Sequence, residues 1–247
     1  MNLFYLEENQ IRESTITILG DDVNHMKNVL RMHTGEQVMV CDCKGSNYLC
    51  EIEAFPEKQV LLSVIERKAE ENELPVKLYL FQGLPKSDKM ELIIQKAVEL
   101  GVYEVIPVAM KRSIVKIEDK KKEAKKLERW QSIATAAAKQ SKRGIIPRVH
   151  RVLSYGEALN YAGNMDLKLF PYENATDIDK SKTLVAKAPQ MKSIAIFVGP
   201  EGGFEDKEIE DVAAIGGQII TLGKRILRTE TAGFTMLSLL MFEIENN

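Results

Sequence analysis

The residues best suited to ligand chemistry lie near the C-terminal end of this 247-residue chain. The apolar run Ile194–Val198 leads into Gly199-Pro-Glu-Gly-Gly-Phe204, and an acidic segment opens a helical pattern from residue 205. This order predicts a buried parallel strand, a tight turn and a helix. Glycines lack a Cβ atom, so the backbone can approach a ligand closely at the carboxyl end of a strand, where open α/β sheets bind ligands. The alternative is a glycine-rich connector that binds nothing.

The glycine spacing narrows the class of ligand. It lacks the Lys-Ser/Thr pair that follows the second glycine of a phosphate-binding P-loop. It also does not match the Gly-x-Gly-x-x-Gly fingerprint of dinucleotide-binding folds. The pattern therefore argues against nucleotide phosphates and favours a ligand held mainly by backbone groups.

A second glycine-bearing loop follows about twenty residues later. The run Gln218–Leu222 predicts another short strand, and Gly223 permits a turn after it. Ile226 and Leu227 are apolar although they fall in an expected surface loop. Their side chains are therefore expected to cover another group. Thr229 or Thr231 is expected to cap the next helix. The two loops are predicted to frame one ligand crevice.

The segment Ala232–Ile244 is apolar almost all round, which predicts a helix that is buried on more than one side. One side can pack on the sheet, and the other is then available for a second subunit. We therefore expect a homodimer contact on this helix. The alternative is a central helix of a monomer.

The chain is expected to form two domains, residues 1–73 and residues 74–247. The first holds short strand-like runs separated by turn residues, which suggests a small β-barrel: Gln37–Cys41, Tyr48–Ile52 and Val60–Ile65. After Pro75, strands alternate with helices, which is typical of an α/β fold with a mostly parallel sheet.

Composition excludes several classes of protein. No apolar stretch approaches membrane-spanning length, and the first residues do not resemble a signal peptide, so a cytoplasmic protein without membrane contact is expected. The cysteines Cys41, Cys43 and Cys50 are odd in number and form no Cys-x-x-Cys spacing. His25, His33 and His150 show no metal-ligand spacing either. We therefore expect reduced cysteines and no metal.

Positive charge is concentrated in the middle of the chain. Residues 74–155 carry 18 Lys and Arg against 8 Asp and Glu, although the whole chain has a net charge of −2. The run Asp119–Lys126 reads as a solvated helix surface. The basic residues around Gly144 are better placed to meet phosphates, so RNA contact is expected there. They are Lys139, Lys142, Arg143, Arg148 and Arg151.

The two loops together resemble the cofactor-binding half of the SPOUT methyltransferases, in particular the RsmE family of ribosomal RNA uracil-N3 methyltransferases. The second motif reads Leu222-Gly-Lys-Arg-Ile-Leu-Arg-Thr-Glu-Thr-Ala232. The resemblance extends to residues 25–32, 86–101, 111–115 and 128–131, so it covers nearly the whole chain. It implies a trefoil-knotted α/β domain and a PUA-like RNA-binding domain before it. It also implies S-adenosyl-L-methionine as methyl donor and 16S ribosomal RNA of the small subunit as partner.

Carried over residue by residue, the resemblance implies two binding sets. Cofactor binding is expected at Val198, Gly199, Glu201, Gly202, Leu222, Gly223, Ile226, Leu227, Thr231 and Ala232. RNA binding is expected at His25, Arg31, Lys86, Lys142 and Arg143. One segment departs from the family pattern, because Lys139 stands where an acid is usual and Lys142 where glycine is usual. This departure weakens any role assigned to those two side chains.

Methylation of uracil N3 requires its proton to leave, and the developing anion needs nearby positive charge or N–H donors. Arg228 is the first candidate for this catalytic task, and its alternative role is a salt bridge with Glu201 or Glu230. Arg112 is the second candidate, because a guanidinium can orient a base or a phosphate. Glu201 is expected to accept a hydrogen bond from the cofactor rather than to remove the proton. The residues do not identify the general base.

Two other classes of function remain at this stage. A non-catalytic RNA-binding ribosome-assembly factor would keep the basic residues and lose the cofactor site, yet this chain retains both glycine loops. A nucleotide-dependent oxidoreductase would need the dinucleotide fingerprint that is missing. The sequence therefore favours a 16S ribosomal RNA (uracil-N3)-methyltransferase.

Overall fold

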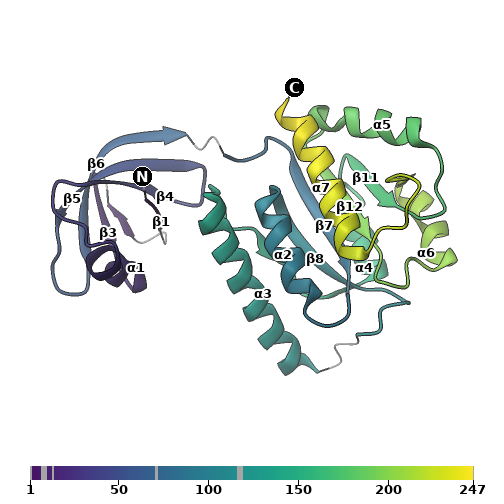
Figure 1. The fold of residues 1–247 in the computed structure, drawn as a ribbon, viewed down its shortest axis with the longest axis horizontal. Coiled ribbons are helices and arrows are strands. Elements are labelled where there is room, and N and C mark those ends of the chain that lie inside the picture. Colours follow the sequence, from purple (N-terminus) through teal and green to yellow (C-terminus); the bar gives the residue numbers. More distant parts are fainter. Residues whose placement is uncertain (1, 7–9, 13, 70–71, 116–118, 247) are drawn as a thin grey trace. The chain divides into compact units, whose positions relative to one another are not determined.

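The computed structural model describes residues 2–6, 10–12, 14–69, 72–115 and 119–246 (Figure 1). The chain divides into two compact units. One unit consists of Met1–Glu73 together with Ala138–Ile146, and the other of Leu74–Ala137 together with Pro147–Asn247. The sequence analysis did not anticipate that residues 138–146 pack with the N-terminal unit.

The first unit contains a six-stranded sheet in the order β1-β4-β5-β6-β3-β2, counted over the described residues. Its strands are β1 (Leu3–Tyr5), β2 (Ile11–Arg12), β3 (Thr15–Ile18), β4 (Gln37–Cys41), β5 (Ser46–Ala54) and β6 (Val60–Ala69). Alternate residues such as Ile16, Ile18, Val38 and Val40 are buried in its core, as the period of two along a strand requires. A helix α1 (Asp21–Asn24) and a π-helix η2 (His25–Val29) follow β3.

Residues 138–146 join this unit through buried polar contacts. The Tyr5 hydroxyl lies 3.0 Å from the Ala138 carbonyl oxygen and 2.7 Å from that of Arg143. The Glu73 carboxylate pairs with the Arg143 guanidinium and accepts from the Gly144 N–H at 2.8 Å. Buried donors need such partners, so this segment is held where its side chains and backbone are satisfied.

The second unit is built on a parallel sheet of seven described strands. The order is β10-β8-β7-β12-β11-β13, with β9 also paired to β8. The strands are β7 (Lys77–Gly83), β8 (Val102–Ala109), β9 (Arg148–Val149), β10 (Leu153–Ser154), β11 (Leu167–Pro171), β12 (Ser193–Val198) and β13 (Gln218–Ile220). Every pairing is parallel, so the carboxyl ends of the central strands meet at one edge.

Helices cover both faces of this sheet. They are α2 (Lys89–Glu99), α3 (Lys120–Ser141), α4 (Tyr155–Ala162), α5 (Ile178–Ala186), α6 (Asp206–Glu210) and α7 (Thr229–Glu245), with short 3-10 helices η3 (Ala188–Gln190) and η4 (Asp211–Ile215). On β7, Leu80 faces α7, whereas Phe81 belongs to the core cluster that includes residues of α4. Successive side chains of a strand point to opposite faces, so α7 and α4 lie on opposite sides. Helices α2 and α7 lie side by side on the same face of the sheet (Figure 1).

Three aromatic rings run across neighbouring strands under the carboxyl edge. Phe81 of β7 and Phe170 of β11 each stack on Phe197 of β12, with ring centroids 4.3 Å apart in both pairs. All three side chains are fully buried. Such cross-strand contacts fix the alignment of the strands from which the functional loops leave.

The α/β class with a parallel sheet and a separate strand-rich N-terminal unit is therefore confirmed. No described helix combines the length and the apolar character needed to cross a bilayer.

Candidate active site

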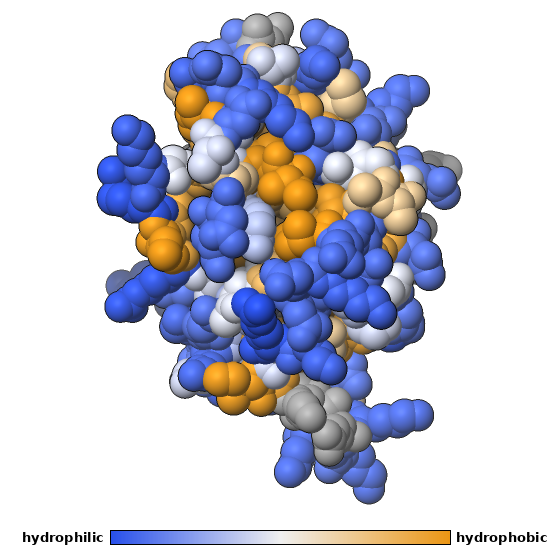
Figure 2. Space-filling view, turned by 90° about the vertical axis from the view of Figure 1, so that its right-hand side faces the viewer, coloured by the Kyte–Doolittle hydropathy of each residue, from blue (hydrophilic) through white to orange (hydrophobic). Residues whose placement is uncertain are grey.

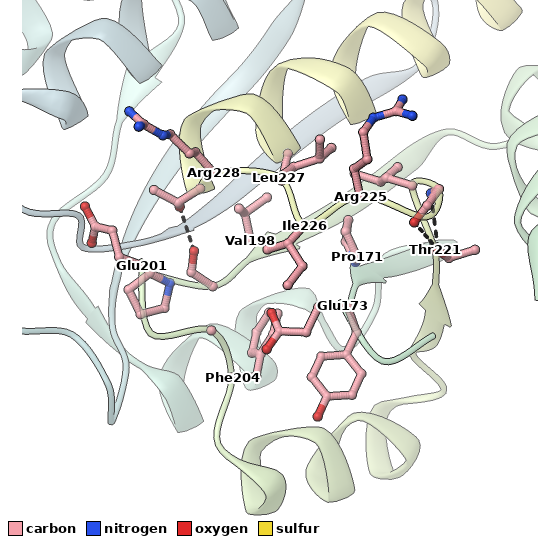
Figure 3. Close-up of a pocket in the computed structure, with 18 of the residues that line it drawn as sticks. Pro171, Glu173, Val198, Glu201, Phe204, Thr221, Arg225, Ile226, Leu227 and Arg228 are labelled. Atoms are coloured by element: carbon pink, nitrogen blue, oxygen red, sulfur yellow. Dashed lines mark hydrogen bonds between the residues drawn. The ribbon is translucent and has the colours of Figure 1, made fainter. Parts of the chain in front are cut away.

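A cavity of about 350 Å³ opens at the carboxyl edge of the parallel sheet (Figure 3). Three loops border it, one after each of the strands β11, β12 and β13, and the first turn of α7 closes it. Its volume falls in the range of small-molecule pockets, roughly 300–1,000 Å³. The predicted crevice between the two glycine loops thus exists, and a third loop contributes to it.

The loop after β12 packs so tightly that side chains are excluded from it. A Cβ on Gly199 would lie 3.1 Å from the carbonyl carbon of Gly203, and Gly203 has a φ of 68°. Behind the loop, a Cβ on Gly83 would lie 2.6 Å from the Pro200 nitrogen. Backbone therefore rests on backbone here, and the loop presents its peptide groups to the cavity.

A buried chain of hydrogen bonds ties this loop to its neighbours. The fully buried Gln82 donates from Nε2 to Thr229 Oγ1 at 2.8 Å, and Thr229 donates to the Gly199 carbonyl oxygen at 2.6 Å. The three residues belong to the end of β7, the loop after β12 and the start of α7. The expectation that Thr229 or Thr231 caps α7 is wrong, because Arg228 is the N-cap residue and no side chain caps the helix.

Lys89 of α2 stands between two carboxylates at the rim of the cavity. Its Nζ lies 3.2 Å from Glu201 Oε1 and 3.2 Å from Glu230 Oε2. Glu201 also accepts from the Lys86 N–H at 3.1 Å. Burial alone would raise the pKa of Glu201, but the hydrogen bonds from its own N–H, the Lys86 N–H and Lys89 outweigh it and lower that pKa. Glu201 is therefore held ionised.

The pairing of Lys89 decides between the two roles considered for Arg228. Neither Glu201 nor Glu230 bonds to Arg228, and the Arg228 guanidinium has no partner among the described residues. Arg228 is exposed and lines the cavity. The salt-bridge alternative is therefore wrong for this structure, and the guanidinium is available to a ligand.

A buried carboxylate attaches the loop after β8 to the same site. Glu208 of α6 is 6% exposed and accepts from the Lys111 N–H at 3.0 Å and from the Glu205 N–H at 2.8 Å. Next to it, Arg112 donates from Nη1 to the Gly202 carbonyl oxygen at 3.0 Å. A Cβ on Gly202 would lie only 3.0 Å from the Arg112 Cβ. Arg112 therefore stands behind the glycine loop and does not line the cavity.

The loop after β13 has fewer anchors. The Thr221 hydroxyl oxygen accepts from the Gly223 N–H at 3.2 Å, and Gly223 has a φ of 113°. Ile226 is 84% exposed, and Lys224 and Arg225 beside it are exposed as well. Figure 2 looks onto the side of the molecule that carries α5 and α6 in Figure 1, where hydrophobic residues gather in the middle and hydrophilic ones border them.

The loop after β11 was not predicted to take part. Pro171, Tyr172 and Glu173 line the cavity. In Figure 3 the Glu173 carboxylate points toward the middle of the labelled residues, whereas the guanidinium groups of Arg225 and Arg228 point away from it. In the sequence, this loop appears only as a polar turn after the strand Leu167–Pro171. Such a turn does not show where the strand lies in the sheet, so it does not predict that the loop reaches the cavity.

Comparison with known proteins decides the family. Residues 72–241 match the family model of an RNA methyltransferase domain, and residues 18–65 match that of an RNA methyltransferase PUA domain. The Bacillus subtilis ribosomal RNA small subunit methyltransferase E is 40% identical over 251 residues, which cover 99% of this chain and 98% of that protein. The chain belongs to the ribosomal RNA small subunit methyltransferase E family.

Two further members of this methyltransferase family agree. The Mesomycoplasma hyopneumoniae enzyme of the same name is 34% identical, with 96% of this chain and 98% of that protein covered. The Neisseria gonorrhoeae ribosomal RNA small subunit methyltransferase E, solved with S-adenosylmethionine bound, is 32% identical and superposes with a TM-score of 0.81 over 98% of this chain and 97% of that one. The predicted family, its SPOUT-type fold and its cofactor are confirmed, and the catalytic interpretation is favoured over an assembly factor without activity.

Most of the expected cofactor residues of this methyltransferase border the one cavity. Those that line it are Val198, Gly199, Glu201, Leu222, Gly223, Ile226, Leu227 and Ala232. Gly202 and Thr231 do not line it. Sequence reasoning missed Thr221, Thr229 and the loop after β11, which also border it. Sequence reasoning also missed Gln82, because no pattern in the neighbouring residues predicts that a glutamine at the end of a strand is buried behind the cavity.

The residues expected to contact RNA have different environments. His25, Arg31 and Lys142 are exposed in the first unit, and Lys86 is exposed in the second. Arg143 is only 4% exposed, and its guanidinium is held by Glu73. An arginine that is buried and paired cannot meet a phosphate, so the expectation for Arg143 does not fit this structure. Its observed role is to hold residues 138–146 in the first unit.

Proposed function

We propose that this protein transfers a methyl group from S-adenosylmethionine to N3 of a uridine in 16S ribosomal RNA of the small subunit. The observation that carries the proposal is the cavity between the two glycine loops. A family member 32% identical to this chain was solved with that cofactor bound. The uracil position rests on the resemblance of the two motifs to the RsmE family.

The residues of the cavity suit this cofactor. Bare backbone at Gly199 and Gly203 leaves room that a Cβ would fill, and it offers N–H and C=O groups to a polar ligand. Val198, Ile226 and Leu227 supply apolar contact of the kind that an adenine ring needs. Glu173 also lines the cavity, and its carboxylate, which no described residue pairs, suits a ligand with positive charge.

When bound, S-adenosylmethionine supplies an activated methyl group on a sulfonium, and transfer leaves a neutral thioether. The chain therefore has to align the acceptor nitrogen with the methyl carbon and exclude water. The tight loop after β12 serves alignment, because Thr229, Lys86 and Arg112 fix it by hydrogen bonds at Gly199, Glu201 and Gly202. The exposed Ile226 is placed to cover bound ligand.

Arg228 is the residue that we assign to the acceptor. Loss of the N3 proton places negative charge on the uracil oxygens, and a guanidinium next to them stabilises that charge. Arg228 suits this task because it borders the cavity and has no bonding partner within the described part of the chain. Arg112 acts through the Gly202 carbonyl oxygen and positions the glycine loop. Glu201 is occupied by Lys86 and Lys89, which makes it a poor proton acceptor.

Three further parts of the proposal concern partners and location. The RNA contacts are assigned to His25, Arg31, Lys86 and Lys142, all exposed. Homodimer contact is assigned to α7, whose Leu239 and Phe242 are 44% and 66% exposed although the helix is apolar. Action on ribosomal RNA implies a cytoplasmic protein.

The experiment is methylation of small ribosomal subunits from a strain that lacks the corresponding gene. The purified protein is incubated with S-adenosylmethionine that carries a deuterated methyl group, and nucleosides are resolved by mass spectrometry. The proposal expects labelled 3-methyluridine from one site. Binding of RNA without any labelled nucleoside would instead support an assembly factor, and label at another atom would refute the N3 assignment.

Two variants make the assay specific. Gly199→Val should remove activity, because its side chain would collide with the Gly203 backbone. Gly156→Ala should retain activity, because no described atom beyond its chain neighbours and its own helix backbone lies within 4 Å of the added Cβ.

A further inference from the structure

The charged side chains that line the cavity differ in whether they are already paired. Glu201 is held by Lys89, which also holds Glu230. Glu173 lines the same cavity and is exposed. Within the described part of the chain, its carboxylate has no hydrogen bond and no ion pair. It is thus the cavity carboxylate that remains open to a ligand.

The backbone of the glycine loop leaves space for this carboxylate. A Cβ on Gly203 would lie 3.2 Å from both carboxylate oxygens of Glu173, so any other residue at 203 would press against them. Glu173 and the loop after β12 therefore meet at the cavity. Figure 3 shows the carboxylate between Phe204 and Ile226, both of which border the cavity. Glu173 is exposed, so water partly screens its charge, but a carboxylate without a partner among the described residues attracts a cation bound in the cavity.

We propose that Glu173 makes this site prefer S-adenosylmethionine over the reaction product by reading the sulfonium charge. The two molecules share the adenosyl group and the amino acid and differ by one methyl group and one positive charge. A carboxylate near the sulfur stabilises the charged cofactor and gains nothing from the neutral thioether product. The product then leaves more readily than the substrate cofactor. This inference rests on the proposed function and adds a specificity-determining residue to it.

The test measures the dissociation constants of S-adenosylmethionine and S-adenosylhomocysteine by calorimetry, for the native protein and for Glu173→Gln. The substitution keeps the shape and removes the charge. We expect affinity for S-adenosylmethionine to fall about tenfold, the effect of losing one partly screened charge. Affinity for S-adenosylhomocysteine should change less than twofold. Raising the salt concentration should lower the native protein's preference for S-adenosylmethionine, measured as the ratio of the two dissociation constants. The same ratio should stay nearly constant for the variant.

Two outcomes overturn the inference. An equal loss for both molecules would mean that Glu173 binds a part that they share, such as the ribose. No loss for either would mean that the carboxylate does not face the ligand. If the native protein binds neither molecule, the proposed function fails first, so the two failures are distinguishable.

Three variants serve as controls. Glu173→Asp keeps the charge and should retain part of the preference. Glu210→Gln removes an exposed charge from α6, outside the cavity lining, and should leave both constants unchanged. Glu201→Gln removes the paired carboxylate and loosens the loop after β12. It should therefore weaken the binding of both molecules to the same extent. Thermal melting confirms that each variant is folded.

Discussion

The two loops that frame the cavity differ in how firmly the protein holds them. The loop after β12 is fixed by Thr229 at Gly199, by Arg112 at Gly202 and by Lys86 and Lys89 at Glu201. The loop after β13 is anchored at Thr221, whose N–H donates to Ser181 and whose hydroxyl bonds to Gly223, and then continues as a run of exposed residues, 223–226. One loop is preorganised, and the other has little to hold it until a ligand is present.

This difference assigns a separate task to each loop. A preorganised loop loses little conformational freedom when a ligand binds, so it sets affinity and alignment. A loosely held loop with an exposed isoleucine gains contacts only when something fills the cavity. Substitutions behind the first loop should therefore change cofactor binding strongly. Substitutions in the second loop should affect it weakly or act on the methyl transfer.

The largest effect is expected from Gly83→Ala. The added Cβ would lie 2.6 Å from the Pro200 nitrogen and 2.7 Å from its Cδ, and backbone atoms cannot move aside cheaply. We expect at least about a hundredfold weaker binding of S-adenosylmethionine, measured by calorimetry. Gly156→Ala is the matched control and should bind normally. Unchanged affinity in Gly83→Ala would show that the position of the loop is not decisive.

Arg228→Ala should lower turnover about a hundredfold, the effect of losing one donor to a developing anion. Affinity for S-adenosylmethionine should stay within about twofold, because Arg228 is assigned to the acceptor. Arg228→Lys should recover part of the rate. Kinetics with small subunits and calorimetry give the two quantities. Equal losses in both would place Arg228 in cofactor binding instead.

Thr229→Val tests the buried hydrogen bonds behind the first loop. The substitution removes the donor to Gly199 and the acceptor for Gln82. We expect the free energy of unfolding to fall by about 2 kcal/mol and cofactor affinity to fall about tenfold. Thr229→Ser should be close to native.

A double-variant cycle sharpens this test. Gln82→Leu and Thr229→Val share one hydrogen bond, so their combined cost should be smaller than the sum of the single costs. Additive costs would mean that the two residues act independently.

The smallest effect is expected from Ile226→Ala. The side chain is 84% exposed, so its truncation should leave the free energy of unfolding unchanged. If Ile226 covers bound cofactor, affinity should fall about fivefold, the effect of losing part of an apolar contact. Ile178→Ala, on α5 and outside the cavity lining, is the control. Lower stability without weaker binding would contradict the assignment of this loop.

Sequence reasoning reached the features that depend on local pattern. The glycines at 199–203, the strand before them and the apolar helix after Arg228 all follow from spacing and composition. The motif resemblance then supplied the cofactor and most of the cavity lining. The strand Gln37–Cys41 was predicted with the bounds that it has.

The rest depends on contacts between distant parts of the chain. Glu173 reaches the cavity only because β11 lies between β12 and β13, and no local pattern reveals strand order. Gln82 and Thr229 meet across 147 residues. Arg143 looked like an RNA contact because it sits in a basic run, yet Glu73, 70 residues away, buries it in an ion pair.

The central claim is that the cavity between the two glycine loops binds S-adenosylmethionine. A crystal structure of the protein grown with that molecule tests it most directly. The account predicts that the adenosyl group lies against Gly199–Phe204 and Leu222–Leu227, with the sulfonium facing Glu173. A structure with the cofactor bound elsewhere, or with side chains closing the cavity while the protein fails to bind it, would contradict the account.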